Sequence, residues 1–155
     1  MTTHRSTIET RRLRISFKLP ADRAMEDFYA SLHPELADLD PLVGEFRQPA
    51  FFSIFLKDDG WHIGTCCLYN ATMDDVELGI RIFIPEYWGK GLGGEAVEGL
   101  VLYAFVMYPH ISSVVLKTPL TNPRAIACYH KCGFEDYMAG KIDGIDMVFM
   151  RRQRK

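Results

Sequence analysis

The sequence contains no hydrophobic run long enough to cross a bilayer. Its longest apolar stretch, residues 100–108, is about half the length of a membrane-spanning helix. Residues 1–12 also lack the apolar centre of a signal peptide. These absences predict a soluble, cytoplasmic protein that does not enter a membrane.

An excess of one charge is also missing. The 18 Lys and Arg residues nearly balance the 20 Asp and Glu residues, and the formal net charge is −2. The basic tail at residues 151–155 is short, and no basic face with interleaved aromatic side chains accompanies it, so a nucleic-acid partner is not expected. Acidic residues are concentrated in residues 20–48. Beside a binding site they would favour a cationic partner.

Cysteine is scarce, and its spacing does not suit a secreted disulfide framework. Cys66 and Cys67 are adjacent on an expected strand, whereas Cys128 and Cys132 lie one helical turn apart. Neither pair has His or acidic residues at a metal-binding spacing. We therefore expect reduced, buried thiols and no metal. The length of 155 residues, of which 48% are hydrophobic, predicts a single globular domain.

Seven segments have the composition or alternation of β-strands. They are residues 13–17, 50–56, 61–69, 76–84, 113–118, 134–138 and 146–150. Asp58-Asp59-Gly60 predicts an antiparallel hairpin between the second and third of them, and residues 141–144 predict a turn between the last two. Because a whole helix separates segment 76–84 from segment 113–118, these two strands should be parallel.

The first helix is expected to begin at Pro20. Two further helical turns would extend to about residue 46. The apolar residues of the first helix recur at helical spacing and predict an inner face made of Met25, Phe28, Tyr29 and Leu32.

A glycine loop connects the strand at 76–84 to a second helix. Gly89, Gly91, Gly93 and Gly94 lie between the two, and the apolar residues that follow recur every three or four positions. Without side chains, these positions let a ligand lie against backbone N–H groups at the positive end of the helix. The loop therefore predicts a phosphate site, most simply for the pyrophosphate of a cofactor.

The same glycines also match the dinucleotide fingerprint G-x-G-x-x-G. That fingerprint expects an acidic residue about 20 positions later, at the end of the next strand. Residues 114–117 read Val-Val-Leu-Lys there, and antiparallel strands precede the loop. A dinucleotide oxidoreductase is therefore disfavoured.

A second motif spans residues 121–134. Asn122 and Pro123 are typical of a helix start, and Gly133 is typical of a helix end. Tyr129 follows Asn122 by about two helical turns, so the two side chains should point the same way.

Together these motifs resemble the GCN5-related N-acetyltransferases, the GNAT family. The resemblance rests on Ile82-Phe83-Ile84-Pro85, on Trp88-Gly89-Lys90-Gly91-Leu92-Gly93, and on Asn122 with Ala125, Tyr129, Lys131, Gly133 and Phe134. Residues 9–14 and 87–91 resemble the branch that includes ribosomal-protein, spermidine and some aminoglycoside acetyltransferases. The fold implied is α/β (α+β), with helices flanking a mixed, mostly antiparallel sheet that splays at its central strand.

The resemblance implies acetyl-CoA as cosubstrate and a primary amine as acceptor. The amine would be a protein N-terminus, a polyamine, an aminoglycoside or another small amine. Backbone groups of Ile82 and Ile84, left unpaired by the splay, would bond the pantetheine and the acetyl carbonyl, and the glycine loop would hold the pyrophosphate. The cofactor-binding residues implied are Ile82, Phe83, Ile84, Gly89, Lys90, Gly91, Leu92, Gly93, Gly94 and Asn122.

Two residues are candidates for proton transfer in such a reaction. Tyr129 would donate a proton to the departing sulfur, because a phenol stays protonated at neutral pH. Glu77, near the start of the central strand, would accept the proton of the amine through water. The acid that some protein acetyltransferases carry five residues before the motif asparagine is Lys117 here, so that base cannot be carried over.

One residue departs from the family pattern without affecting the cofactor assignment, and one alternative function stays open. Trp88 replaces the Arg or Gln with which the family usually opens its glycine loop. The alternative to an enzyme is a domain that binds acetyl-CoA as a sensor or interaction module without transferring the acetyl group. The sequence also leaves open the acceptor, the acyl-chain preference and the oligomeric state, a homodimer included.

Overall fold

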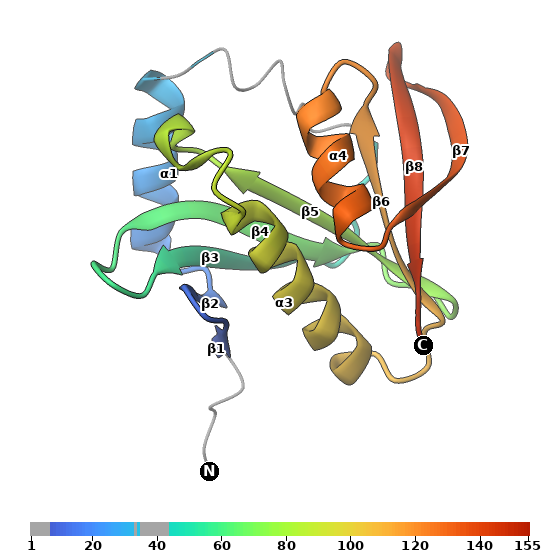
Figure 1. Ribbon diagram of the computed structural model, residues 1–155, viewed down its shortest axis with the longest axis horizontal. Coiled ribbons are helices and arrows are strands. Elements are labelled where there is room, and N and C mark those ends of the chain that lie inside the picture. Colours follow the sequence, from blue (N-terminus) through green and yellow to red (C-terminus); the bar gives the residue numbers. More distant parts are fainter. Residues whose placement is uncertain (1–6, 33, 35–43) are drawn as a thin grey trace.

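The computed structural model describes residues 7–32, 34 and 44–155, whose strands form one sheet in the order β1-β2-β3-β4-β5-β6-β8-β7 (Figure 1). The strands are β1 Thr7–Glu9, β2 Leu13–Phe17, β3 Ala50–Leu56, β4 His62–Tyr69, β5 Asp75–Ile82, β6 Ser113–Pro119, β7 Glu135–Ile142 and β8 Ile145–Gln153. The helices are α1 Pro20–Leu32, α3 Leu92–Met107, α4 Pro123–Lys131 and the short 3-10 helix η2 Pro85–Tyr87.

Neighbouring strands are antiparallel except for β5 and β6, as the sequence predicts. The parallel ladder contains only three pairs and ends at Glu77 opposite Val115. Beyond this pair β5 continues to Ile82, while β6 stays with β8 as far as Pro119 opposite Met147. We call the opening between the diverging ends of β5 and β6 the fork. The expected splay at the central strand is confirmed.

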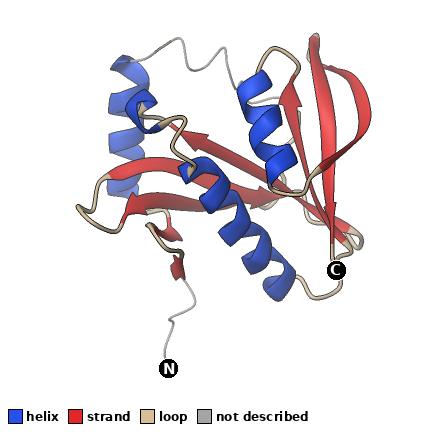
Figure 2. Ribbon diagram, viewed as in Figure 1, coloured by secondary structure: helices blue, strands red, loops and turns tan. Residues whose placement is uncertain are grey.

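Helices α3 and α4 cover one face of the sheet (Figure 2). Because side chains alternate along a strand, β2 and β3 direct Ile15, Phe52 and Ile54 towards α3, where they are fully buried. The facing stripe of α3 includes Val97 and Leu100, which are also fully buried. These buried contacts pack α3 against the sheet next to the opening between β5 and β6.

Helix α1 contacts the opposite face of the sheet, but not through the face predicted for it. Met25, Phe28 and Leu32 are 42%, 56% and 55% exposed. Of the predicted inner face, only Tyr29 makes such a contact, stacking on Phe83 with ring centroids 5.1 Å apart. The helical turns expected after this helix fall largely on residues 35–43, which lie outside the described residues.

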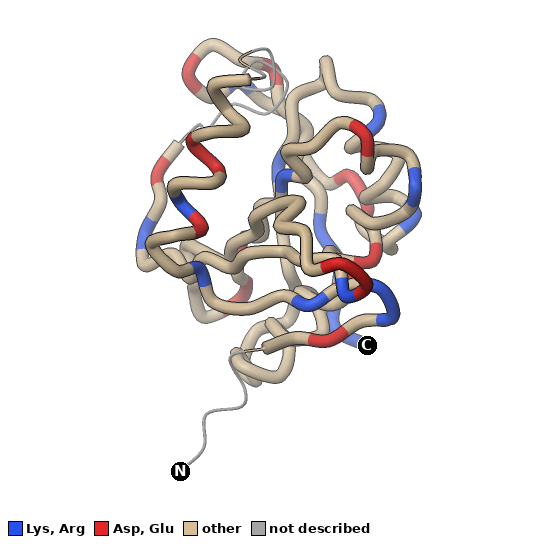
Figure 3. Tube along the Cα trace, turned by 90° about the vertical axis from the view of Figure 1, so that its left-hand side faces the viewer, with Lys and Arg blue, Asp and Glu red and all other residues tan. Residues whose placement is uncertain are grey.

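Polar side chains occupy the interface between α1 and the sheet. Ser53 Oγ donates a hydrogen bond to Asp22 at 2.8 Å, and Lys18 Nζ pairs with Glu26 at 2.8 Å. Asp22, Glu26 and Tyr29 are spaced four and three residues apart, so they form the stripe that meets the sheet. Both acidic and basic positions lie on this side of the molecule (Figure 3). The apolar stripe of Met25, Phe28 and Leu32 therefore stays largely exposed.

The other differences from the sequence-based expectations are small. Strand β5 ends two residues earlier than expected, β4 begins one residue later, and β1 was not anticipated. The final hairpin is longer than expected, and it turns at Asp143 and Gly144, whose φ angles of 52° and 81° suit a two-residue turn. Among the described helices, none combines the length and apolar character needed to cross a membrane.

Candidate functional site

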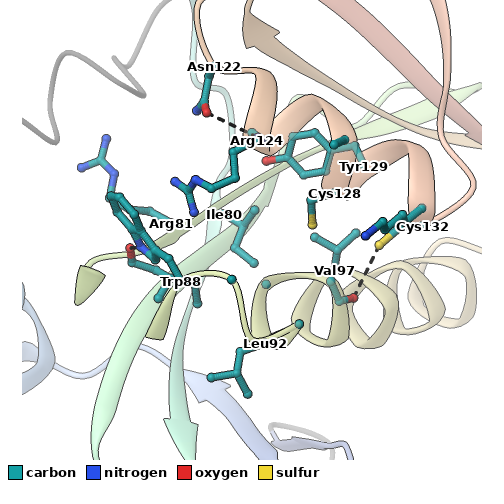
Figure 4. A pocket seen from close by; sticks show the side chains of 18 of the residues that line it. Ile80, Arg81, Trp88, Leu92, Val97, Asn122, Arg124, Cys128, Tyr129 and Cys132 are labelled. Carbon is teal, nitrogen blue, oxygen red and sulfur yellow. Dashed lines mark hydrogen bonds between the residues drawn. The ribbon is translucent and has the colours of Figure 1, made fainter. Parts of the chain in front are cut away.

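A cavity of about 390 Å³ lies in the fork between β5 and β6 (Figure 4). Its walls come from the end of β5, the glycine loop, the first turn of α3 and one face of α4. The residues that line it are Ile80, Arg81, Ile82, Tyr87, Trp88, Gly89, Gly91, Leu92, Gly93, Gly94, Val97, Thr118, Asn122, Arg124, Ala125, Ala127, Cys128, Tyr129, Lys131 and Cys132. Eight of the twelve predicted site residues are thus brought together. Phe83, Ile84, Lys90 and Glu77 are not part of this lining.

The glycine loop delivers the N-terminus of α3 to the cavity. Gly91 caps the helix in the left-handed conformation, with φ of 80°. A Cβ atom at this position would lie 3.3 Å from Arg12 Nη2, whereas a Cβ at Gly93 would meet nothing within 4 Å. The first N–H groups of a helix lack intrahelical acceptors and carry partial positive charge. The first turn of α3 therefore presents an open surface suited to an anion.

A side-chain clamp holds this loop against the N-terminal part of the sheet. The carboxylate of Glu95 accepts hydrogen bonds from Arg12 N at 2.6 Å and Arg12 Nε at 2.8 Å. Arg12 Nη1 also donates to the carbonyl of Lys90 at 3.1 Å. Burial raises the pKa of Glu95, but the hydrogen bonds from Thr10 and Arg12 lower it by more, so its pKa is lowered overall. We call this contact the Arg12–Glu95 clamp.

Carbonyl groups at the end of β5 are already engaged. Trp88 Nε1 donates to the carbonyl of Ile82 at 2.8 Å, and the backbone N–H of Tyr87 donates to the carbonyl of Ile84 at 3.0 Å. Unpaired backbone groups were expected at Ile82 and Ile84, and for their two carbonyls this expectation does not hold. The cause is local, because η2 folds back after Ile84 and places the Trp88 indole beneath the strand.

Phe83 lies on the far side of the strand from the cavity. It is 5% exposed and packs against Tyr29 and His62. Its backbone N–H bonds to Ile63 of β4 at 3.0 Å. Since backbone groups alternate along an antiparallel strand, the N–H of Ile82 points towards the fork. A ligand bound in the fork would therefore meet the backbone N–H of Ile82.

Helix α4 supplies the wall opposite the glycine loop. Asn122 caps it by accepting a hydrogen bond from the N–H of Ala125 at 3.4 Å, which confirms the expected helix start. Arg124 points into the cavity, where its guanidinium lies 3.9 Å from the centre of the Trp88 ring (Figure 4). Lys131 lines the same wall. Arg124 was not predicted as a site residue, and no binding role was predicted for the positive charge of Arg124 or Lys131. The sequence does contain a signal for both, because Arg124, Cys128 and Lys131 are spaced to lie on one helix face.

Tyr129 lines the cavity from the last turn of α4. It is 9% exposed, and its ring meets the edge of Phe134 with centroids 6.2 Å apart. Its ring lies across the cavity from the first turn of α3 (Figure 4). A phenol in this position is held by packing, so its hydroxyl has a defined place in the cavity wall.

Cys128 and Cys132 also belong to this wall, which the sequence did not predict. Both are half-buried, whereas Cys66 and Cys67 are buried as expected. Cys132 Sγ lies 3.6 Å from the carbonyl oxygen of Gly94, to which it can donate. Both sulfurs thus lie against the first turn of α3, and Cys132 also packs at the edge of the hydrophobic core.

Glu77 lies apart from the cavity lining. Its carboxylate pairs with Lys117 on β6 and accepts hydrogen bonds from the Tyr69 hydroxyl at 2.9 Å and the Asn70 amide at 3.3 Å. Glu77 and Lys117 have side-chain exposures of 15% and 9%. The structure therefore does not place Glu77 next to Tyr129. Among the described residues, no three His, Cys, Asp or Glu side chains converge as they would around a metal ion.

Comparison with known structures agrees with this geometry. The ribosomal-protein-S5-alanine acetyltransferase from Vibrio fischeri superposes with a TM-score of 0.78 and 15% identity, over 95% of this chain and 96% of that one. AAC(6′)-Ib in complex with ribostamycin and coenzyme A gives a TM-score of 0.73 and 18% identity, over 93% of this chain and 94% of that one. Another structure of AAC(6′)-Ib contains acetyl-CoA. At these identities the likeness establishes the fold.

Family membership follows from the sequence match. The family model described as the acetyltransferase (GNAT) domain matches residues 7–135. The match includes the Arg12–Glu95 clamp, and it includes the glycine loop and all of α4, which line the cavity. The chain therefore belongs to the GNAT acetyltransferase family.

Proposed function

We propose that this chain transfers an acetyl group from acetyl-CoA to a primary amine. The observation that carries the proposal is that the fork cavity joins the glycine-rich start of α3 to Tyr129 on α4. The coenzyme A and acetyl-CoA present in similar structures support it. When bound, acetyl-CoA supplies an activated acetyl group and a thiol leaving group.

The glycine loop and the cations of α4 would hold the phosphates. Gly93 offers open space beside backbone N–H groups, so the pyrophosphate could approach the helix start without steric hindrance. Arg124 and Lys131 add positive charge on the opposite wall. Lys90, whose carbonyl is held by Arg12, would contribute through the backbone of the loop.

The end of β5 would hold the pantetheine. The N–H of Ile82 faces the fork, and its carbonyl is bonded to Trp88. A pantetheine amide that accepts from Ile82 N–H leaves the Trp88 bond intact, whereas one that donates to the carbonyl must displace the indole. We propose the first arrangement. Leu92 lines the same cavity and would pack against the chain of methylene groups.

Two side chains would handle protons. Tyr129 is proposed to protonate the departing sulfur, since it is the phenol that α4 holds in the cavity wall. Glu77 is proposed to accept the amine proton through water at the base of the fork. Its carboxylate is also engaged by the ion pair with Lys117 and by hydrogen bonds from Tyr69 and Asn70. Substituting Glu77 and Lys117 separately distinguishes a role of Glu77 in proton transfer from its role in the ion pair.

A cationic acceptor is proposed from the acidic residues of α1. Asp22, Glu26 and Asp27 lie on this helix, and Glu26 has one carboxylate oxygen that is buried without a hydrogen-bond partner. Lys18 already neutralises part of this charge. A cationic acceptor should therefore show a KM that rises with ionic strength, whereas a neutral amine should not.

The experiment that tests the function is release of coenzyme A thiol from acetyl-CoA. The purified protein is offered polyamines, aminoglycosides, amino acids and basic N-terminal peptides in parallel, and acetyl-CoA affinity is measured separately by calorimetry. Acceleration by one amine class over the acceptor-free rate is the expected result. If acetyl-CoA binds tightly but no amine class accelerates thiol release, the proposed acetyltransferase activity is overturned. That result would support a domain that binds acetyl-CoA without transferring the acetyl group.

A further inference from the structure

Cys128 and Cys132 lie together in the cavity wall but have no part in the proposed transfer. An ideal Cβ on Gly94 would lie 3.8 Å from Cys128 Sγ and 3.6 Å from Cys132 Sγ, so both sulfurs meet the same point of α3. Glycine at position 94 leaves room for them. Two thiols that converge on one point of a ligand cavity are unlike Cys66, which is buried in the core.

The surroundings of Cys128 favour its thiolate. Arg124 and Lys131 lie one turn away on either side along α4, and the N-terminus of α3 is opposite. A hydrogen bond from the Cys132 thiol is the largest cause that lowers the pKa of Cys128, and the same contact raises the pKa of Cys132. These surroundings favour a thiolate on Cys128 and a protonated thiol on Cys132. Burial instead raises the pKa of Cys66.

The backbone permits a bond between the two sulfurs. Four residues of α-helix separate Cα atoms by about 6 Å, which lies within the range of disulfides. Cys132 is the C-cap of α4, with φ of −86° and ψ of 9°, and its N–H bonds to both Cys128 and Tyr129 carbonyls. The regular helix ends at Cys132, so its backbone is less constrained than that of a residue inside α4.

We propose that Cys128 and Cys132 form a thiol–disulfide exchange site within the cavity, with low-molecular-weight disulfides as the oxidant. The Cys128 thiolate attacks one sulfur of the disulfide, breaks its S–S bond and expels one thiolate. Cys132 loses its proton and attacks the Cys128 sulfur of the mixed disulfide, which expels the second thiolate and forms the Cys128–Cys132 bond. The two cysteines lose two electrons and two protons, and the oxidant leaves as two thiols.

Oxidation of this site should weaken binding in the cavity. A mixed disulfide on Cys128 would occupy the space beside Gly94, and the internal bond would remove the thiolate and draw Cys132 away from the Gly94 carbonyl. This consequence rests on the proposed function, because it assumes that coenzyme A lies against the same turn of α3. Bound coenzyme A should in turn slow the attack on Cys128.

The test treats the native protein with glutathione disulfide and follows its intact mass. Wild type is expected to lose the mass of two hydrogen atoms, and peptide mapping should place the bridge between Cys128 and Cys132. Cys132→Ser should instead accumulate one glutathione adduct on Cys128. Cys128→Ser should form neither the bridge at the rate of wild type nor the glutathione adduct at the rate of Cys132→Ser. As the control for a folded sample, Cys66 and Cys67 should be alkylated only after denaturation.

Separate outcomes bear on the redox site and on the acetyltransferase. No reaction of Cys128 in the native protein, or equal reaction rates for Cys128→Ser and wild type, would overturn the exchange site. That result would leave acetyl-CoA turnover untouched. If the bridge forms but neither acetyl-CoA nor coenzyme A binds, the exchange site stands and the proposed function fails.

Discussion

Glu77 and Lys117 face each other across the base of the fork. Glu77 belongs to the last ladder pair of β5 and β6, and Lys117 lies two residues beyond that pair on β6. Their ion pair therefore spans the first step at which the two strands have separated. The Tyr69 hydroxyl contacts both groups, at 2.9 Å from Glu77 and 3.3 Å from Lys117. The ion pair therefore links the two strands at the point where they separate.

Substituting either partner should lower stability by a similar amount, while only one substitution should affect the chemistry. Glu77→Gln and Lys117→Met each leave a largely buried partner uncompensated, with an expected loss of about 3 kcal/mol in the free energy of unfolding. If Glu77 accepts the amine proton, Glu77→Gln should also lower kcat by about 100-fold. Chemical denaturation and steady-state kinetics measure the two effects.

Lys117→Met is the matched control, since it breaks the same ion pair without removing the carboxylate. It should retain kcat at temperatures where it is folded. Equal kcat values for both variants and wild type would show that Glu77 serves only to tie the strands. The proton acceptor would then have to be sought among groups nearer the cavity.

Gly91→Ala should weaken binding of coenzyme A as well as stability. The substitution forces an alanine into a left-handed conformation, at a cost of about 1 kcal/mol, and brings its Cβ against Arg12. Gly60→Ala imposes the same backbone strain in the β3–β4 hairpin, where its Cβ would meet nothing within 4 Å. Calorimetric titration should show weaker binding for Gly91→Ala alone. Equal affinities would place the phosphates elsewhere.

Tyr129→Phe should lower kcat by about 100-fold and leave the affinity for acetyl-CoA unchanged. The substitution removes the hydroxyl but keeps the ring that packs against Phe134. Tyr137→Phe, on β7 and 41% exposed, removes a hydroxyl away from the cavity and should behave like wild type. Pre-steady-state measurement of thiol release separates the chemical step from product release. Unchanged kcat in Tyr129→Phe would mean that the sulfur leaves without this proton donor.

The Arg12–Glu95 clamp should lose its stabilising effect in acid. The pKa of Glu95 is lowered in the native state, so the unfolded chain takes up the proton first as pH falls. Stabilisation is complete above the unfolded pKa of about 4.3 and is lost as pH falls through the lower native pKa. The stability difference between wild type and Glu95→Gln should therefore be large at neutral pH and small in acid. A pH-independent difference would contradict this, and exposed Glu135→Gln provides the baseline.

Much of the fold and the site could be predicted because their signals are local. Gly133 adopts the positive φ that its position at the end of α4 predicts, and Asn122 caps α4 as its position before Pro123 predicts. The parallel pairing of β5 and β6 follows from the length of the connection between them. Each of these features depends on residues close together in sequence.

Two of the failed predictions depend on contacts between distant segments, and one depends on a local reversal of the chain. The spacing of Met25 and Phe28 is that of a buried stripe, yet periodicity cannot reveal that the sheet opposite α1 presents Ser53 and Lys18. The Ile82 carbonyl is engaged by Trp88, and only the path of η2 shows that the indole reaches it. The thiols of Cys128 and Cys132 were expected in the core because sequence alone does not orient α4 against α3.

The Arg12–Glu95 clamp joins residues that are 83 positions apart in the chain. During synthesis the glycine loop therefore cannot adopt its final form until the edge strands and the start of α3 have met. Once formed, the connection is reciprocal: a ligand that stabilises the loop also stabilises the distant β1–β2 hairpin. Backbone amides at that edge should then exchange with solvent more slowly when the cavity is filled, although the ligand does not touch them.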